Sequence, residues 1–263
     1  EMAHLANQHG VEANVLSRQE AQQLEPNVEL DVRGAVHFPG DGHLNPAKLH
    51  CFLKDYLVTK GVQLVSQAQV LRFEHMGDCI QTIVTTQGDY TCDQLIVCAG
   101  AWSGELAGKL GIYLPMLSGK GYSFMQQNQP ALQLPAILCE RKVAVTPFGE
   151  QVRFGGTMEI TGTDHSINQQ RVRGIFDAIP KYYASFQSTF PESEKVWSGL
   201  RPCSPDGLPY IGATQRWRNV LFGTGHSMMG VSLAPATGKV LAEQLLQKKA
   251  QLLTDAFSPD RYN

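Results

Sequence analysis

The residue of this sequence best suited to binding a charged ligand is an arginine in a proline-rich segment. Arg201 lies within SGLRPCSPDGLPYIG, residues 198–212, where three prolines restrict the backbone. A guanidinium stays charged at any working pH and holds a carboxylate through two parallel hydrogen bonds. We therefore expect Arg201 to bind the carboxylate of a substrate. The alternative is that Arg201 pairs with Asp206 in a structural turn.

A second feature is a glycine-rich run that leads into the last helix, GTGHSMMGVSLAPATGKVLAEQLL. Its small residues recur every fourth position, at Gly230, Ala234, Gly238 and Ala242. Positions four apart share one helix face, so a flat ligand or a backbone could approach it closely. The amide groups at such a helix start carry partial positive charge and suit an anion or an electron-rich ring. The alternative is a glycine-rich turn before a buried helix.

Three blocks of this chain, in the expected order, resemble the D-amino acid oxidase and glycine oxidase superfamily of FAD-dependent oxidoreductases. They are DQLIVCAGAWS at 93–103, the segment 198–212 and GTGHSMMG at 223–230. The segment at 143–162 is similar, more narrowly, to the substrate lobe of bacterial D-amino acid dehydrogenases. The resemblance covers nearly the whole chain. It implies FAD as the cofactor and oxidative deamination of a (D-)amino acid or related secondary amine to an imine and 2-oxo acid.

The resemblance also implies roles for individual residues. Arg201 would clamp the substrate carboxylate, and His226 would lie beside the flavin, hydrogen bonding or packing there, with a general base as the alternative. Tyr122 would line the substrate pocket or else belong to the core. Cys203 would be an ordinary thiol, because the cysteine that carries flavin in some relatives corresponds to about Gly199 here. The implied flavin contacts are Val70, Ala99, Gly100, Trp102, Gly225, His226, Met228, Met229 and Gly230.

The elements that must position these residues predict an α/β fold of mixed α+β character. We expect an incomplete Rossmann-like FAD-binding lobe, residues 47–114 and 196–263, and a substrate lobe with a largely antiparallel sheet, residues 28–46 and 115–195. Residues 1–27 are expected to form a helical segment. The apolar run Leu95–Cys98 predicts a strand buried on both faces. A turn of small residues follows it, where a dinucleotide could lie against bare backbone. A helix is also expected near 182–190.

Composition excludes several other classes of function. The 263 residues have a net charge of −2 and are 43% hydrophobic, so we expect no nucleic-acid partner and no transmembrane segment. The six cysteines form no C-x-x-C pair and predict free thiols in a reducing compartment. The histidines show no metal-ligand spacing, so no metal is expected. The cysteine usage favours a cytoplasmic protein. The family resemblance implies a small amino acid as the substrate and allows peripheral contact with the inner membrane.

The G-x-G-x-x-G turn with which this superfamily binds the flavin pyrophosphate does not occur in the sequence. The early glycines between Gly34 and Gly42 have the wrong spacing. We expect a C-terminal portion of the family fold that binds FAD poorly alone, and that associates with a complementing N-terminal segment or with itself. The alternative is a non-catalytic fragment or pseudo-enzyme that acts as a binding or assembly module.

Overall fold

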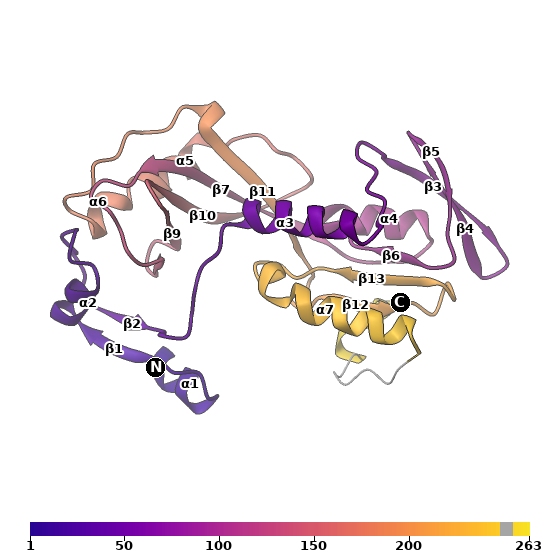
Figure 1. Cartoon of the computed structure of the whole chain (residues 1–263), viewed down its shortest axis with the longest axis horizontal. Coiled ribbons are helices and arrows are strands. Elements are labelled where there is room, and N and C mark those ends of the chain that lie inside the picture. Colours follow the sequence, from indigo (N-terminus) through magenta and orange to yellow (C-terminus); the bar gives the residue numbers. More distant parts are fainter. Residues whose placement is uncertain (248–254) are drawn as a thin grey trace. The chain divides into compact units, whose positions relative to one another are not determined.

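The computed structural model describes residues 1–247 and 255–263, whose contacts divide the chain into two compact units (Figure 1). Unit 1 comprises residues 1–62, 121–157 and 166–198. Unit 2 comprises residues 63–120, 158–165 and 199–263. The expected lobe boundary at 196 lies close to the division after Ser198. Residues 47–62, expected in the FAD-binding lobe, instead cluster with unit 1.

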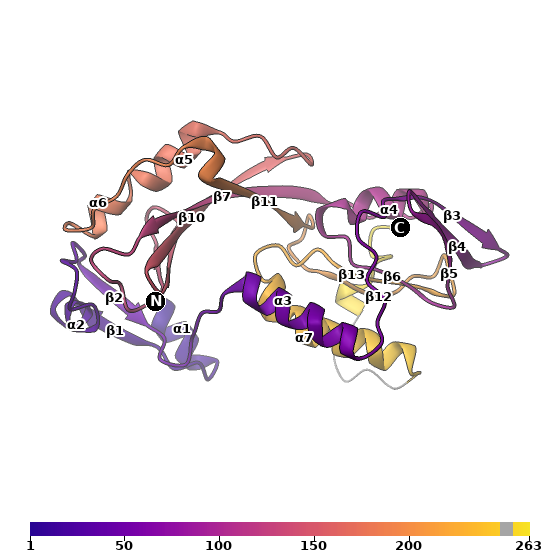
Figure 2. The ribbon, with the colours of Figure 1, turned by 45° about the horizontal axis from the view of Figure 1, so that its top comes forward.

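The five-stranded sheet has the order β11-β7-β10-β9-β8, and β9 pairs antiparallel with both of its neighbours. Strands β8 and β9 lie wholly in unit 1, whereas β7, β10 and β11 each have residues in unit 1 and in unit 2. The strands are β7 (Leu117–Gln127), β8 (Ala136–Leu138), β9 (Val143–Phe148), β10 (Gln151–Thr161) and β11 (Val196–Cys203). Helices α5 (Gln169–Phe176) and α6 (Ile179–Tyr182) pack on this sheet (Figure 2). Phe124 and Phe154 from the sheet and Ile175 from α5 are at most 2% exposed, so they anchor the core between the two layers.

The N-terminal part of unit 1 alternates helices with a two-stranded sheet. Its elements are α1 (Met2–Gln8), β1 (Asn14–Ser17), α2 (Arg18–Leu24), β2 (Gly34–His37) and α3 (Pro46–Thr59). Ser17 and Glu20 form a reciprocal capping box that begins α2. The two short helices expected within residues 1–27 are present as α1 and α2, and the structure adds a strand between them, because residues 14–17 pair antiparallel with 34–37. Two apolar residues between two polar ones fit either a strand or a helix, and here the pairing with residues 34–37 decides.

Unit 2 contains two three-stranded sheets. The first has the order β3-β4-β5 and is antiparallel; the second has the order β12-β13-β6, in which β13 runs parallel to β6 and antiparallel to β12. The strands are β3 (Val70–Met76), β4 (Cys79–Thr85), β5 (Gly88–Thr91), β6 (Leu95–Val97), β12 (Tyr210–Ala213) and β13 (Val220–Thr224). The mixed α/β fold with antiparallel sheets was predicted from the sequence and is confirmed.

Helix α7 (Gly230–Leu245) lies against β12 and β13 of unit 2 (Figure 1). Val240 and Leu241 are buried against Ile211 and Leu221 of this sheet. The short helix α4 (Ser103–Lys109) follows the turn η1 (Gly100–Trp102), and Ala107 packs into a second cluster with Tyr210 and Phe222. Another short turn, η3 (Asp255–Phe257), precedes the C-terminus.

Two further expectations about single elements are wrong. The strand at 95–97 is not buried on both faces: Val97 is 3% exposed, whereas Ile96, which points to the opposite face, is 39% exposed. No helix covers 182–190, because Tyr183 and Phe186 turn into the core of unit 1 and fix the backbone there. Among the residues described, no helix combines the length and the apolar content needed to cross a membrane.

Candidate functional site

Arg201 lies near the end of β11, within unit 2. Its Nη1 donates to the carbonyl oxygen of Gly119 on β7 at 3.3 Å. Burial is the larger effect and lowers the pKa of the Arg201 guanidinium below its ordinary value, while the charge interaction with Cys203 opposes this shift. Because the ordinary pKa of arginine is far above neutrality, the side chain remains a cation. Arg201 is therefore a partly buried positive charge held at a fixed position.

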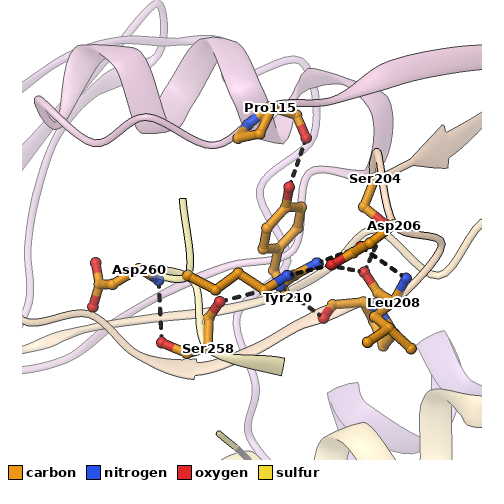
Figure 3. Close-up of polar contacts among 9 residues, drawn as sticks. Pro115, Ser204, Asp206, Leu208, Tyr210, Ser258 and Asp260 are labelled. Atoms are coloured by element: carbon orange, nitrogen blue, oxygen red, sulfur yellow. Dashed lines mark hydrogen bonds and ion pairs between the residues drawn. The ribbon is translucent and has the colours of Figure 1, made fainter. Parts of the chain in front are cut away.

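The carboxylate of Asp206 binds Arg261, not Arg201. Arg261 Nε and Nη2 donate to the two carboxylate oxygens at 2.8 and 3.0 Å. The same guanidinium donates to the carbonyl of Leu208 at 2.7 Å and lies 3.9 Å from the ring centroid of Tyr210. Figure 3 shows Asp206 and Leu208 beside Tyr210, whose hydroxyl donates to Pro115 at 2.7 Å. The alternative reading, an Arg201–Asp206 pair, is therefore wrong.

Gly119, whose carbonyl accepts from Arg201, packs against Met158, and sequence reasoning did not single out either residue. A Cβ at Gly119 would collide with Met158 Sδ and would lie 3.0 Å from Cys203 Sγ. Arg201 and Cys203 are two residues apart on β11, so they share a face of the sheet. Two sulfur-bearing side chains thus pack over bare backbone beside the cation. The only sequence signal was the glycine pair around Lys120.

The loop before α7 is attached directly to the strand that carries Arg201. Ser227 N donates to Pro202 O at 2.8 Å, and Cys203 and His226 form an antiparallel bridge. Cys203 Sγ also lies 3.5 Å from Ser227 Oγ. Gly225 has φ +82°, and a Cβ there would lie 3.0 Å from Tyr210 Cδ2, so this bend requires glycine. The two sequence features that suggested chemistry, Arg201 and the glycine-rich run, therefore meet within one unit.

His226 is partly buried between this loop and α7. Its Nε2 lies 2.8 Å from the hydroxyl oxygen of Thr237. Burial lowers the pKa of the His226 imidazole and so favours its neutral form. The ring is held at one nitrogen by a helix side chain that sequence reasoning did not identify.

Two turns lie together at the carboxyl ends of the parallel strands β6 and β13. Thr224 Oγ1 accepts from Ser103 Oγ at 2.8 Å and donates to Gly100 O at 3.2 Å. Gly100 has φ +56°, and an added Cβ there would meet nothing within 4 Å. Carboxyl ends of parallel strands are the usual place for nucleotide ligands in α/β sheets. Ala99, Gly100 and Gly225, all predicted as flavin contacts, are therefore brought to one sheet edge.

The first turn of α7 is open and apolar. Its N-cap residue, Met229, makes no side-chain capping hydrogen bond. Met228 and Met229 are 70% and 54% exposed, and Val231 is 54% exposed. Uncapped amide groups carry partial positive charge, and exposed apolar side chains beside them suit a flat aromatic ring with electron-rich oxygens. These residues fit the flavin ring that the sequence implied.

The remaining predicted contacts are placed as follows. Trp102 is 43% exposed and stacks on His165 with 6.1 Å between ring centroids. Val70 begins β3, and its carbonyl oxygen accepts from Lys109 Nζ at 3.2 Å. Tyr122 is 1% exposed within the core of unit 1, and its hydroxyl donates to Ser166 O at 3.4 Å. This is the position of a core tyrosine, which is the alternative that the sequence left open for Tyr122.

Comparison with known proteins places this geometry in context. A family model described as FAD dependent oxidoreductase matches residues 1–244. A D-amino acid dehydrogenase from Bradyrhizobium diazoefficiens is 32% identical over 97% of this chain and 61% of its own length. One from Vibrio atlanticus is 29% identical over 98% of this chain and 63% of its own length. The chain therefore spans about three fifths of the length of these relatives.

Solved structures show the same fold. A glycine oxidase from Geobacillus kaustophilus superposes with a TM-score of 0.89 over 99% of this chain and 70% of its own, at 23% identity. An L-proline dehydrogenase from P. horikoshii gives a TM-score of 0.86 over 98% of this chain and 71% of its own, at 20% identity. At these identities the likeness establishes the fold alone.

Proposed function

Because the chain belongs to the family of FAD-dependent oxidoreductases that includes the D-amino acid dehydrogenases, we propose that it forms the substrate-binding part and part of the flavin-binding part of such an enzyme. The reaction would be oxidative deamination of a D-amino acid, or of a related secondary amine. The observation that carries the proposal is the direct attachment of the Arg201 strand to the start of α7, through the Ser227–Pro202 hydrogen bond of 2.8 Å.

Arg201 supplies the binding energy and the orientation of the substrate. Its guanidinium holds the carboxylate through charge-assisted hydrogen bonds, and this directs the Cα–H bond of the substrate toward the first turn of α7. FAD, when bound, supplies the hydride acceptor. The substrate amine reacts in its neutral form, so the chain needs no strong base. Water then hydrolyses the imine to a 2-oxo acid, releasing ammonia from a primary amine substrate or a primary amine from a secondary one.

Residues at the sheet edge would hold the cofactor. Ala99, Gly100 and Gly225 offer bare backbone, and the amide groups at Gly230 offer partial positive charge to the electron-rich side of the ring. Met228 and Met229 would cover its apolar surface, Trp102 would contact the cofactor beyond the η1 turn, and Val70 would contact the adenine side through its backbone. His226 would bind beside the ring.

The part of the relatives that this chain does not cover has a proposed role as well. The G-x-G-x-x-G turn of the family is not found in these 263 residues. We propose that a complementing segment with that turn supplies the pyrophosphate contacts and that FAD affinity is low without it. Each contact of this kind contributes about 1.5–3 kcal/mol, so several together change affinity by many orders of magnitude.

The experiment compares the chain alone with the same chain joined to the N-terminal segment of the Bradyrhizobium relative. Each is titrated with FAD, and the complex is mixed anaerobically with D-amino acids, sarcosine, glycine and hydroxyproline. We expect tight FAD binding only in the joined protein, and bleaching of the flavin absorbance by at least one D-amino acid. A flavin-loaded joined protein that no amine reduces would contradict the proposal and favour a non-catalytic binding module.

A further inference from the structure

We propose that Thr237 holds His226 as a neutral imidazole with its proton on Nδ1, so that His226 serves the site as a hydrogen-bond donor and not as a base. The inference concerns the role of His226 in the proposed flavin site, and in that respect it rests on the proposed function. Thr237 would be a positioning residue that acts through His226.

The two side chains meet in a protected position. Thr237 lies in the second turn of α7 and is 7% exposed, and its Oγ1 is 2.8 Å from His226 Nε2. Its methyl group faces Gly223, where an added Cβ would lie 3.3 Å from Cγ2. The side chain is therefore held between β13 and the loop, so that the hydroxyl faces the imidazole.

The balance of donors and acceptors selects one tautomer. Within residues 1–247 and 255–263, Nε2 of His226 is the single hydrogen-bond partner of the Thr237 hydroxyl, and no bond to a carbonyl one turn earlier occurs. A hydroxyl has one proton to donate, and a buried donor without an acceptor is destabilising. If Nε2 carried a proton, the Thr237 hydroxyl oxygen would accept a hydrogen bond from Nε2–H. The hydroxyl proton of Thr237 would then lack an acceptor. Nδ1 of His226 is not among the buried atoms without a partner, so water can accept a proton carried there, whereas Thr237 is only 7% exposed. The hydroxyl therefore donates to the Nε2 lone pair, and the ring proton resides on Nδ1.

The consequence for the site follows from the backbone around His226. Its bridge to Cys203 and the Ser227–Pro202 hydrogen bond fix the residue against the strand of Arg201. With Nε2 engaged and Nδ1 already protonated, the ring has no lone pair available to take a proton from substrate. An N–H group on Nδ1 suits a carbonyl or anionic acceptor, and a flavin ring presents such acceptors. His226 thus recognises the cofactor and does not transfer protons.

The tautomer can be measured without flavin. The full chain, labelled with 15N-histidine, is examined by long-range 1H–15N correlation at about pH 8, where an ordinary histidine is neutral. The variant His226→Gln identifies the resonance. We expect the Nδ1–H pattern in the wild type and in Thr237→Ser, which keeps the hydroxyl. Thr237→Val should move the tautomer ratio about threefold or more toward Nε2–H, as expected for the loss of one ordinary hydrogen bond.

Thr214→Val is the matched control, because Thr214 is a buried threonine whose hydroxyl binds Asp260 at 2.8 Å. It should leave the His226 signal unchanged. An Nε2–H pattern in the wild type, or an unchanged ratio in a folded Thr237→Val, would overturn the proposal. Should Thr237→Val not fold, the wild-type and Thr237→Ser spectra still decide it. These spectra need no cofactor, so failure here is distinguishable from failure of FAD binding or substrate oxidation.

Discussion

Arg261 and Asp206, 55 positions apart, form a bidentate ion pair with donor–acceptor distances of 2.8 and 3.0 Å. The pair attaches the C-terminal residues to the turn that follows β11. Because Arg261 occupies both oxygens of this carboxylate, the only acidic side chain in the Arg201 segment is bound elsewhere. Asp206 is therefore a structural carboxylate and is not the partner of Arg201.

The Arg261–Asp206 pair predicts a dependence of stability on pH. The hydrogen bonds from Arg261 hold the pKa of Asp206 well below its usual range. A carboxylate with a depressed pKa in the folded state stabilises the protein above its unfolded pKa of about 3.9, and this contribution is lost as the pH falls below that value. The stability difference between wild type and Asp206→Asn, measured by urea unfolding, should therefore shrink as the pH falls below about 4.

The variant Arg261→Met should destabilise unit 2 by about 1–3 kcal/mol near neutral pH, since hydrogen bonds to charged groups are lost. Arg72→Met is the control, because Arg72 forms an exposed pair with Glu74 at 2.7 Å. Exposed pairs contribute about 0–1 kcal/mol. Equal effects of the two substitutions would contradict the structural role of Arg261.

Substitution of Arg201 should remove substrate binding more than stability. In the FAD-loaded joined protein, Arg201→Gln should lower kcat/KM about 100-fold or more, because two charge-assisted hydrogen bonds to the carboxylate disappear. Arg201→Lys keeps the charge without the planar fork and should recover only part of the loss. Steady-state kinetics with the best D-amino acid checks this. An Arg201→Gln enzyme with unchanged kcat/KM would show that the carboxylate binds elsewhere.

Gly119 should be intolerant of a side chain for local reasons. A Cβ there meets Met158 Sδ, the far end of a flexible side chain, so Gly119→Ala should displace Met158 with a stability cost of about 1 kcal/mol. We also expect KM for the substrate to rise about tenfold, because displacement of Met158 disturbs the backbone to which Arg201 is hydrogen bonded, and small misplacements of a binding group weaken substrate binding. Gly108→Ala is the control: Gly108 lies in α4 with open space around it, and the change should be neutral or slightly stabilising.

Gly225 combines a left-handed backbone with a close contact, and the two costs can be separated. Gly225→Ala should destabilise the protein by about 2–3 kcal/mol, because φ is +82° and the ring of Tyr210 lies 3.0 Å from the new atom. Gly10→Ala should cost only about 1 kcal/mol, since Gly10 has φ +76° but open space. Chemical unfolding of both variants measures how much each substitution lowers the free energy of unfolding. An equal loss in the two variants would show that the contact with Tyr210 adds no cost at Gly225.

The sequence predicted the turns and the helix start whose backbone conformation depends on glycine. The turns at Gly100 and Gly225 and the helix that follows the second one were visible as glycines, because the positive φ values there favour that residue. The partner of Asp206 could not be predicted, because Arg261 reaches it only through the folding of unit 2. The contact of Thr237 with His226 could not be predicted either, because the two residues meet only when the loop before α7 folds back onto the helix.

Tertiary contacts also explain the elements that the sequence misassigned. Residues 14–17, Asn-Val-Leu-Ser, form too short a segment to show a strand or helix period, and their pairing with residues 34–37 makes them a strand. Tyr183 and Phe186 have a spacing compatible with a helix, yet both are buried in the core of unit 1 from irregular backbone. Propensity over a few residues is a weak determinant where packing against distant residues decides.

The most direct test of the account is a crystal structure of the joined protein with FAD and a non-reacting carboxylate. We expect the guanidinium of Arg201 to donate two hydrogen bonds of about 2.7–3.2 Å to the carboxylate, and the isoalloxazine to face the amide groups at the start of α7. A carboxylate held by other residues, or a ring bound away from the first turn of α7, would contradict the central claim.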